Sequence, residues 1–470
     1  MPTGHIIRAF TYLLLLVVVA AVAHAIPAGE PRAKAMVEAL STGDPAIYEK
    51  AVQENLTPAM LARRTPQDRA AFVKTVHEDF GTLEIDAVTA DAEGLHIAAH
   101  GKGGKKLRFT FVFDGTPEAR IQSLRIEMGG GGGDGPAVKL PPLNLPATMN
   151  DADRTTAIDT WIAPLVGRDA FAGVVVVARD GKPIFLRAYG PADREKSVAA
   201  NTDTTYNIAS IGKKFTQTAI GKLLEDGKLK LTTTIGDVIP DYPNAVSRSA
   251  TIDQLVNMKG GIADFFGPGF DKIDRTKLNS NHAYFEYVSK LPPLFAPGAQ
   301  EQYCNGCYVV LGEIVERLTH TKFEDFVQRT VFTPAGMTRS GYFNTANLPT
   351  NTAVSYGHVR GPNAPYENTR PLHGAAGSGA GGAYATAKDL LAFDEALRNG
   401  RLVDTKTTAW VLRGEPKAGR NDAEMGIGGG GPGTNAVLES GGTWTVVVTA
   451  NVDPPVPETM GVALARALAR

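Results

Sequence analysis

Cysteine, net charge and long apolar stretches are all scarce in this chain of 470 residues. Only two cysteines occur, Cys304 and Cys307, so a small scaffold built on disulfides is excluded. Lysine and arginine total 48 against 49 aspartates and glutamates, and this balance gives no reason to expect nucleic acid or an anionic surface as partner. No second Cys/His pair stands at metal-ligand spacing, which argues against zinc. We expect neither a metal nor a cofactor.

The first residues contain a short apolar run, Leu13–Val19, which is too short to span a bilayer. Arg8 precedes it, and Ala23-His24-Ala25 supplies the small-x-small pattern that signal peptidase accepts. No cysteine follows the run, so a lipoprotein anchor is unsupported. We predict a signal peptide over residues 1–25 and an exported, periplasmic or secreted protein with no stable membrane span after cleavage. A retained N-terminal anchor is the alternative.

Cys304 and Cys307 stand at C-x-x-C spacing, which suits redox chemistry or half of a metal site. An oxidising compartment would allow a bridge between them, although a bridge across one helical turn is strained unless the helix begins there. We interpret the pair as structural or incidental, and the sequence leaves open whether the two are bridged.

The length exceeds one ordinary domain, and 43% apolar with 21% charged residues suits soluble globular domains. The consecutive glycines of Gly129–Gly133 break regular structure, and prolines continue up to Pro146. We therefore predict a linker over residues 129–148. It separates a first unit, residues 27–128, from a second unit, residues 149–470.

The first unit has the pattern of a small α+β domain. Thr65-Pro66 is a good helix start, with a capping side chain and proline at the first helical position, and the helix runs to about Asp79. Short turns then separate four predicted strands, at 83–90, 95–101, 106–114 and 120–128. This order weakly resembles the cone-shaped nuclear-transport-factor-like domains. No acid/base pair is evident in it.

The second unit begins and ends with strands around a helical middle. We predict helices at 153–166, at 210–227 and at 458–469, with strands at 173–179, at 183–189, around 437–438 and at 444–451. Strands at both ends of one domain imply a single antiparallel sheet built from both ends. The fold class is therefore α+β, an antiparallel sheet flanked by helices with an all-helical cluster, preceded by the small α+β domain.

Ser210 and Lys213 carry the strongest chemical signal. A serine hydroxyl is a poor nucleophile and needs a base within hydrogen-bond reach. Residues three apart on a helix share a face, so the Lys213 amine can lie beside the Ser210 oxygen. The S-x-x-K pattern alone is weak, because both residues are common on solvated helix faces.

Several further segments, in the right order, strengthen this signal. Together they resemble the serine β-lactamase and penicillin-binding-protein superfamily, on its class C and related-esterase branch, over about the last 320 residues. The matching segments are Gly173–Lys182, Tyr206–Thr216, Pro297–Glu316 with its Tyr-x-Asn motif, and Gly379–Leu390.

The resemblance assigns expected tasks to individual residues. Ser210 is the nucleophile, Lys213 and Tyr303 share its proton, and Tyr303 also serves the attacking water or the leaving group. Asn305 holds Lys213 and donates to a substrate carbonyl. The Ser210 N–H, with Gly429 and Gly430, forms the oxyanion site. The expected reaction is hydrolysis of an ester or amide, peptide or β-lactam-like, in a small-molecule or peptide substrate through a Ser210 acyl-enzyme.

Two positions depart from that pattern. Ile427 stands where the third motif places lysine or histidine, and an apolar side chain cannot donate to a substrate carboxylate. This puts β-lactams and carboxylate-terminated peptides in doubt, and it motivates a second hypothesis, a catalytically impaired binding or sensor module. The segment Leu255–Gly261 stands where many members of that superfamily carry His-Thr-Ser-Gly. We interpret this difference as structural drift.

Two further hypotheses concern His373 and the first domain. A Ser-His-Asp triad through His373 is conceivable, but the chain has no G-x-S-x-G elbow. Alternatively, the first domain carries out the binding function of the protein, and the hydrolase domain contributes nothing to it. Substrate identity depends on loops such as Phe265–Asn281, and oligomeric state is not readable from the sequence.

Overall fold

The computed structural model describes residues 29–61, 65–91, 94–102, 106–128, 140–266, 270–360, 364–412 and 424–469. The signal peptide predicted at 1–25 lies outside these ranges, as does most of the predicted linker.

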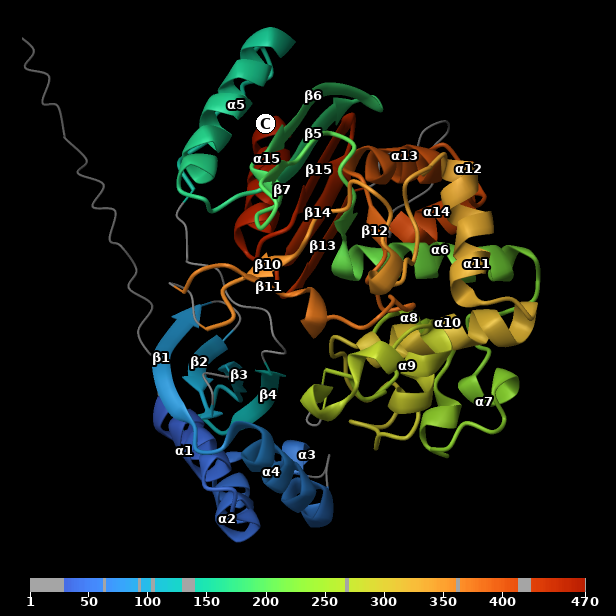
Figure 1. Ribbon diagram of the computed structural model, residues 1–470. Coiled ribbons are helices and arrows are strands. Elements are labelled where there is room, and N and C mark those ends of the chain that lie inside the picture. Colours follow the sequence, from blue (N-terminus) through green and yellow to red (C-terminus); the bar gives the residue numbers. More distant parts are fainter. Residues whose placement is uncertain are drawn as a thin grey trace, which may run out of the picture.

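The N-terminal unit has its own hydrophobic core between helices and a four-stranded antiparallel sheet of order β1-β2-β3-β4 (Figure 1). Leu107, Phe109 and Phe111 alternate along one strand and are buried there, as period-two patterning requires. Each predicted strand lies within one residue of an observed one. The elements are α1 (Glu30–Ser41), α2 (Pro45–Asn55), α3 (Pro58–Leu61), α4 (Pro66–Phe80), β1 (Glu84–Asp91), β2 (Gly94–His100), β3 (Lys106–Phe113) and β4 (Ile121–Met128). The likeness to nuclear-transport-factor domains stays a prediction.

The second unit is built on a five-stranded antiparallel sheet of order β13-β14-β15-β5-β6. Its strands come from both ends of the unit, as predicted, because β15 pairs directly with β5. The strands are β5 (Gly173–Arg179), β6 (Lys182–Tyr189), β13 (Met425–Gly431), β14 (Thr434–Gly441) and β15 (Trp444–Ala450). The predicted fold class is confirmed.

Both faces of this sheet are covered. Val175 and Val177 of β5 pack with helices α5 (Asp151–Gly167) and α15 (Val456–Leu468). Val174 and Val176 point the other way, into the core shared with the helical region. Successive side chains of a strand alternate between faces, so an unbroken run of valines is what a doubly covered strand needs. Figure 1 shows α5 and α15 on one side of the sheet and α6 and α13 on the other.

Helices and short strands fill the region between β6 and β13. They are β7 (Pro191–Asp193), β8 (Val198–Ala199), β9 (Tyr206–Asn207), α6 (Gly212–Glu225), α7 (Ile235–Val238), α8 (Ile252–Val256), α9 (Asn281–Val288), α10 (Asn305–Thr319), α11 (Phe323–Val327), α12 (Thr333–Ala335), β10 (Tyr356–Gly357), β11 (Glu367–Asn368), β12 (Tyr384–Ala385), α13 (Ala387–Arg398) and α14 (Thr405–Leu412).

Helix α6 is held rigidly inside this region. Phe215 is fully buried and meets the rings of Phe332 and Phe393 edge to face, each with centroids 4.9 Å apart. Edge-to-face pairs add to the free energy gained by burying the rings themselves. The helix is therefore fixed relative to the sheet, which matters because it carries the candidate nucleophile.

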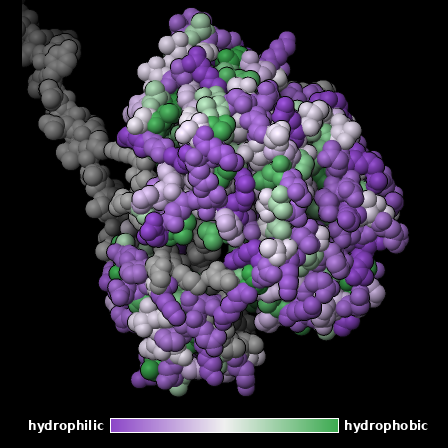
Figure 2. Space-filling view, in the orientation of Figure 1, coloured by the Kyte–Doolittle hydropathy of each residue, from purple (hydrophilic) through white to green (hydrophobic). Residues whose placement is uncertain are grey.

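The face of the molecule seen in Figure 2 is mainly polar. Figure 2 shows hydrophilic residues over most of the visible face, with apolar side chains in small separate groups. Among the helices that the structure describes, none has both the length and the apolar character that crossing a bilayer requires.

Candidate active site

Ser210 lies in a single 3-10 turn, Ala209–Ile211, that leads directly into α6. Ala209 has a φ of 44°, a left-handed conformation that residues other than glycine rarely adopt. Its N–H donates to Asn207 Oδ1 at 2.9 Å, and its carbonyl accepts from the Gly382 N–H at 3.1 Å. These bonds hold a sharp turn that places Ser210 at the amino-terminal end of α6, where backbone N–H groups lack partners within the helix.

Lys213 is almost fully buried one turn along α6, with 3% of its surface exposed. Its Nζ lies 3.1 Å from Ser210 Oγ, 2.6 Å from Asn305 Oδ1 and 2.6 Å from the Ala380 carbonyl oxygen. Two of these partners are pure acceptors, so each must receive an N–H from the amine.

Tyr303 completes a triangle with the serine and the lysine. Its hydroxyl lies 2.6 Å from Ser210 Oγ, and either oxygen can be the donor. Lys213 Nζ is 4.8 Å from the centroid of the Tyr303 ring, within the range of a cation–π contact. The Tyr303 side chain is 51% exposed, so the group that contacts the nucleophile also faces solvent. Tyr303 lies 93 residues after Ser210 in the sequence, yet the two hydroxyls are in contact.

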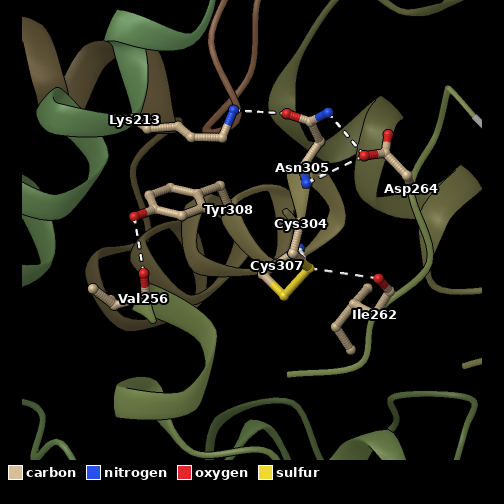
Figure 3. Close-up of a disulfide and its surroundings, with 8 residues drawn as sticks. All are labelled: Lys213, Val256, Ile262, Asp264, Cys304, Asn305, Cys307 and Tyr308. Atoms are coloured by element: carbon tan, nitrogen blue, oxygen red, sulfur yellow. Dashed lines mark hydrogen bonds between the residues drawn. A yellow bond between two sulfur atoms is a disulfide. The ribbon is translucent and has the colours of Figure 1, made fainter. Parts of the chain in front are cut away.

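Asn305 is the first residue of α10 and is held from both sides. Its Oδ1 accepts from Lys213, and its Nδ2 donates to Asp264 Oδ2 at 2.8 Å (Figure 3). The Asn305 backbone N–H points to the same carboxylate oxygen at 3.4 Å. Burial raises the pKa of Asp264, against the opposing effect of these hydrogen bonds. The site thus continues inward from Ser210 through Lys213 and Asn305 to Asp264.

Strand β13 runs beside the nucleophile at Gly429. A Cβ atom on Gly429 would lie 2.4 Å from the Ile208 carbonyl oxygen and 2.8 Å from the Ser210 nitrogen. Only glycine allows so close a backbone approach. The Asn435 side chain donates to the Gly429 carbonyl at 2.9 Å and braces the strand at this point. The two predicted oxyanion partners, Ser210 and Gly429, are therefore in direct backbone contact, and Gly430 follows as an exposed residue.

Ile427 lies two residues before Gly429 and therefore on the same face of β13. It pairs across the sheet with Leu438 and packs, partly buried, against the core of the helical region. The position where the resemblance expects a lysine or histidine thus offers only apolar surface beside the site.

His373 does not take part in this arrangement. Its Nε2 lies 2.9 Å from the Pro432 carbonyl oxygen, while Ser210 Oγ bonds Tyr303 and Lys213. Burial lowers the pKa of His373, which favours a neutral ring that donates to the carbonyl. The geometry gives no support to a Ser-His-Asp triad.

The two cysteines are bridged, with their Cα atoms 5.3 Å apart. Cys304 is the N-cap of α10, and its sulfur accepts from the Cys307 N–H at 3.0 Å. The helix therefore begins at the bridge, the condition that makes a C-x-x-C disulfide sterically acceptable. Cys304 sits between Tyr303 and Asn305 in the chain, so the bridge adjoins the site (Figure 3).

Sequence reasoning missed two groups in this site. Asp264 follows the Leu255–Gly261 segment that we interpreted as drift, and its partner Asn305 is 41 residues away. The Ala380 carbonyl lies in the glycine-rich landmark Gly379–Leu390 and accepts from Lys213. A carboxylate in an otherwise apolar and glycine-rich stretch was the one local signal for Asp264.

A second cluster of polar groups lies on α9 and α10. His282, Glu313 and Glu316 each place a ligand atom within 4.8 Å of the others. Glu313 is buried, but His282 Nδ1 lies 2.9 Å from its Oε2 and Arg317 Nε lies 2.8 Å from its Oε1. These contacts satisfy the buried carboxylate as an ion-pair network, so we assign no metal to it.

Glu316 of that cluster is expected to make stability depend on pH. Burial raises its pKa to about 7 from an ordinary value of 4.5. Between these pH values the folded chain keeps a proton that the unfolded chain releases, so stability falls as pH rises through this window. Glu316→Gln removes the titration and keeps an acceptor for the Phe323 N–H. The difference in Tm, variant minus wild type, should rise from about pH 4.5 to pH 7 and then level off.

Thermal melts followed by circular dichroism at several pH values measure this difference. The exposed Glu301→Gln is the control, since its side chain is 70% exposed. A Tm difference for Glu316→Gln that is flat across the window would contradict the assignment.

The five-stranded sheet with its helices, and the contacts of Ser210 with Lys213 and Tyr303, match what the sequence predicts for a β-lactamase-type serine hydrolase domain. A family model described as Beta-lactamase matches residues 158–469, well over half of the chain. The chain therefore belongs to the β-lactamase family.

Individual relatives agree with this assignment. The chain is 25% identical over 312 residues to Penicillin-binding protein 4* of Bacillus subtilis, covering 60% of this chain and 68% of that one. The crystal structure of a penicillin binding protein from Bacillus halodurans matches with a TM-score of 0.58 at 25% identity, over 65% of this chain and 98% of that chain. A D-amino acid amidase from Ochrobactrum anthropi shares the fold, with a TM-score of 0.55 at 21% identity, over 67% and 98%.

Proposed function

We propose that this protein is an exported serine hydrolase that cleaves an ester or amide bond through an acyl-enzyme on Ser210. The observation that carries the proposal is the contact of Ser210 Oγ with both the Tyr303 hydroxyl, at 2.6 Å, and the Lys213 amine, at 3.1 Å. A nucleophile within reach of its base is the minimum geometry for covalent catalysis. Export rests on the predicted signal peptide at residues 1–25.

The surroundings of Lys213 support its action as a base. A neutral amine has two N–H groups and one lone pair. Asn305 Oδ1 and the Ala380 carbonyl, both at 2.6 Å, take the two N–H groups. The lone pair then remains for the Ser210 hydroxyl proton. In the proposed first step this proton moves to Lys213 Nζ as Ser210 Oγ attacks the carbonyl carbon.

Tyr303 connects this proton to the rest of the reaction. Its hydroxyl touches Ser210 Oγ and its side chain faces solvent. We therefore propose that the leaving group departs on the side of Tyr303. In the proposed second step the proton passes from Lys213 by way of Tyr303 to the leaving alcohol or amine. Water then enters at the same place, gives up a proton to these groups, and hydrolyses the Ser210 ester.

In the proposed mechanism, backbone N–H groups stabilise the negative charge that develops on the carbonyl oxygen of the substrate. Ser210 N–H lies at the amino-terminal end of α6, and β13 approaches it at Gly429. The Gly430 N–H is the second donor in the proposal. Preorganised N–H groups of this kind contribute a large share of the rate in acyl transfer.

The apolar surface of Ile427 limits the range of substrates that we propose. Among the residues that the structure describes on β13, none carries a positive charge. A substrate carboxylate would therefore lose its hydration without gaining an ion pair there. The favoured substrate is an ester or amide that is uncharged next to the bond to be cleaved.

The direct test is covalent labelling of purified protein. Incubation with a fluorophosphonate should add one adduct to Ser210, visible in the intact mass, and a short-chain chromogenic ester should be turned over. Ser210→Ala should lose both. A panel of activated esters, β-lactams and D-amino-acid peptides then ranks substrates. Absence of adduct and turnover in the wild type, or identical behaviour of Ser210→Ala, refutes the hydrolase.

Ile427 also favours a second candidate, a binding or sensor module that keeps the penicillin-binding shape. In that case a ligand binds with an affinity that Ser210→Ala leaves unchanged, and no acyl adduct forms. Calorimetric titration of both proteins with the panel separates this candidate from the hydrolase.

Ile427→Lys is expected to shift selectivity toward anionic substrates. The new ammonium would lie on the Ser210 face of β13, near a substrate carboxylate. We expect kcat/KM for an ester with a neighbouring carboxylate to rise about tenfold relative to its uncharged analogue, as for a charge-assisted hydrogen bond of moderate strength. Ile427→Met, similar in size and uncharged, is the control. If the ratio of kcat/KM for the carboxylate ester to kcat/KM for its uncharged analogue is equal in both variants, this position does not discriminate between charged and uncharged substrates.

A further inference from the structure

Asp264 is a carboxylate that the proposed reaction does not use directly, yet its side chain is bonded to the residues around the site. Its Oδ1 accepts from the Phe266 N–H at 2.9 Å. Its Oδ2 lies 2.8 Å from Asn305 Nδ2 and 3.4 Å from the Asn305 backbone nitrogen. The residue is partly buried and stands at the amino-terminal end of α10, where negative charge is favoured.

The carboxylate decides which way the Asn305 amide points. An asparagine side chain has a donor end and an acceptor end that are almost equal in shape. A carboxylate oxygen accepts only, so the Nδ2 end must face Asp264. The Oδ1 end then faces Lys213 Nζ, at 2.6 Å, and takes one of its N–H groups (Figure 3).

The loop that carries Asp264 is fastened to the start of α10 at further points. Gly306 has no room for a side chain, since a Cβ there would lie 2.1 Å from the Ala263 carbonyl oxygen. Cys304 Sγ lies 3.5 Å from the Ile262 carbonyl oxygen, next to the disulfide. The segment that carries Asp264 therefore packs against the first turn of α10, which also carries Asn305.

We propose that Asp264 is a positioning residue that fixes the Asn305 amide and, through it, the Lys213 amine in the orientation that serves Ser210. This inference rests on the proposed function. Without the carboxylate, the amide can turn its Nδ2 toward Lys213, and two donors then face each other. Lys213 would lose an acceptor and with it the fixed direction of its lone pair toward Ser210 Oγ.

A double-mutant cycle tests this coupling. Asp264→Asn, Asn305→Ala and the double variant are compared with wild type for the rate of fluorophosphonate labelling and for kcat and KM on a short-chain ester. Asp264→Asn should lower kcat about tenfold or more with KM nearly unchanged, and should have little further effect once Asn305 is truncated. Asp264→Glu should recover part of the rate. Asp253→Asn, an exposed Asp–Asn contact on α8, is the control.

The outcomes separate the inference from the function. Additive effects in the cycle, or a change confined to KM, overturn the inference while the hydrolase stands. No labelling of the wild type refutes the hydrolase. In that event the inference is still decided by selective ¹⁵N-asparagine NMR, in which the Asn305 side-chain amide protons should exchange slowly in wild type and fast in Asp264→Asn. Equal exchange in both overturns it. Melting curves confirm that the variants are folded.

Discussion

Lys213→Arg is expected to reduce kcat for ester hydrolysis by about 10²- to 10⁴-fold, the usual contribution of general acid–base catalysis. Arginine keeps the positive charge and the donors, but a guanidinium does not give up a proton in a protein, so it has no lone pair for the Ser210 hydroxyl. The substitution therefore separates the charge of Lys213 from its basicity. Stopped-flow or steady-state assays with a chromogenic ester measure the loss.

Two further variants test whether the loss of activity comes from the missing base or from misfolding of the buried site. Lys213→Met has a similar length without charge, and it should lose activity to the same degree. Lys222→Arg lies on the same helix, with Glu225 and Asp226 as surface partners, and should behave as wild type. If Lys213→Arg melts normally and keeps the wild-type kcat, the amine is not the base and Tyr303 must act alone.

The sequence predicts much of the scaffold that supports this chemistry, because the decisive patterns are local. The apolar run at 173–179 is predicted as a strand and forms β5, and the four strands predicted in the first unit each lie within one residue of an observed strand. The Ser210–Lys213 spacing fixes their shared helix face without any tertiary information. Such features depend on neighbours within a few residues.

The parts that sequence reasoning missed depend on distant partners. Asp264 meets Asn305 only because the loop before it folds over the start of α10, and no pattern near Asp264 encodes that contact. The state of Cys304 and Cys307 followed from where α10 begins, a boundary that single-sequence reasoning places only within a few residues. Convergence of Tyr303 on Ser210 was available only through resemblance to a family.

Gly429→Ala is expected to cause the second large loss of activity, about 10²-fold or more in kcat, together with a lower Tm. The added Cβ would lie 2.4 Å from the Ile208 carbonyl oxygen and 2.8 Å from the Ser210 nitrogen, both backbone atoms that cannot swing away. Strand β13 must therefore move away from the nucleophile. A shift there displaces the proposed oxyanion donors, and losing one such donor costs about 10²- to 10³-fold.

Gly431→Ala supplies a matched control on the same strand. A Cβ on Gly431 would meet only Thr434 Cγ2, at 3.5 Å, which is an ordinary contact. Its position two residues on gives it the same face as Gly429, so both variants add one methyl group to one face of β13. Rates of fluorophosphonate labelling and ester turnover should fall for Gly429→Ala alone. Equal rates in the two variants would mean that close approach of β13 to Ser210 does not support catalysis, and that the oxyanion site lies elsewhere.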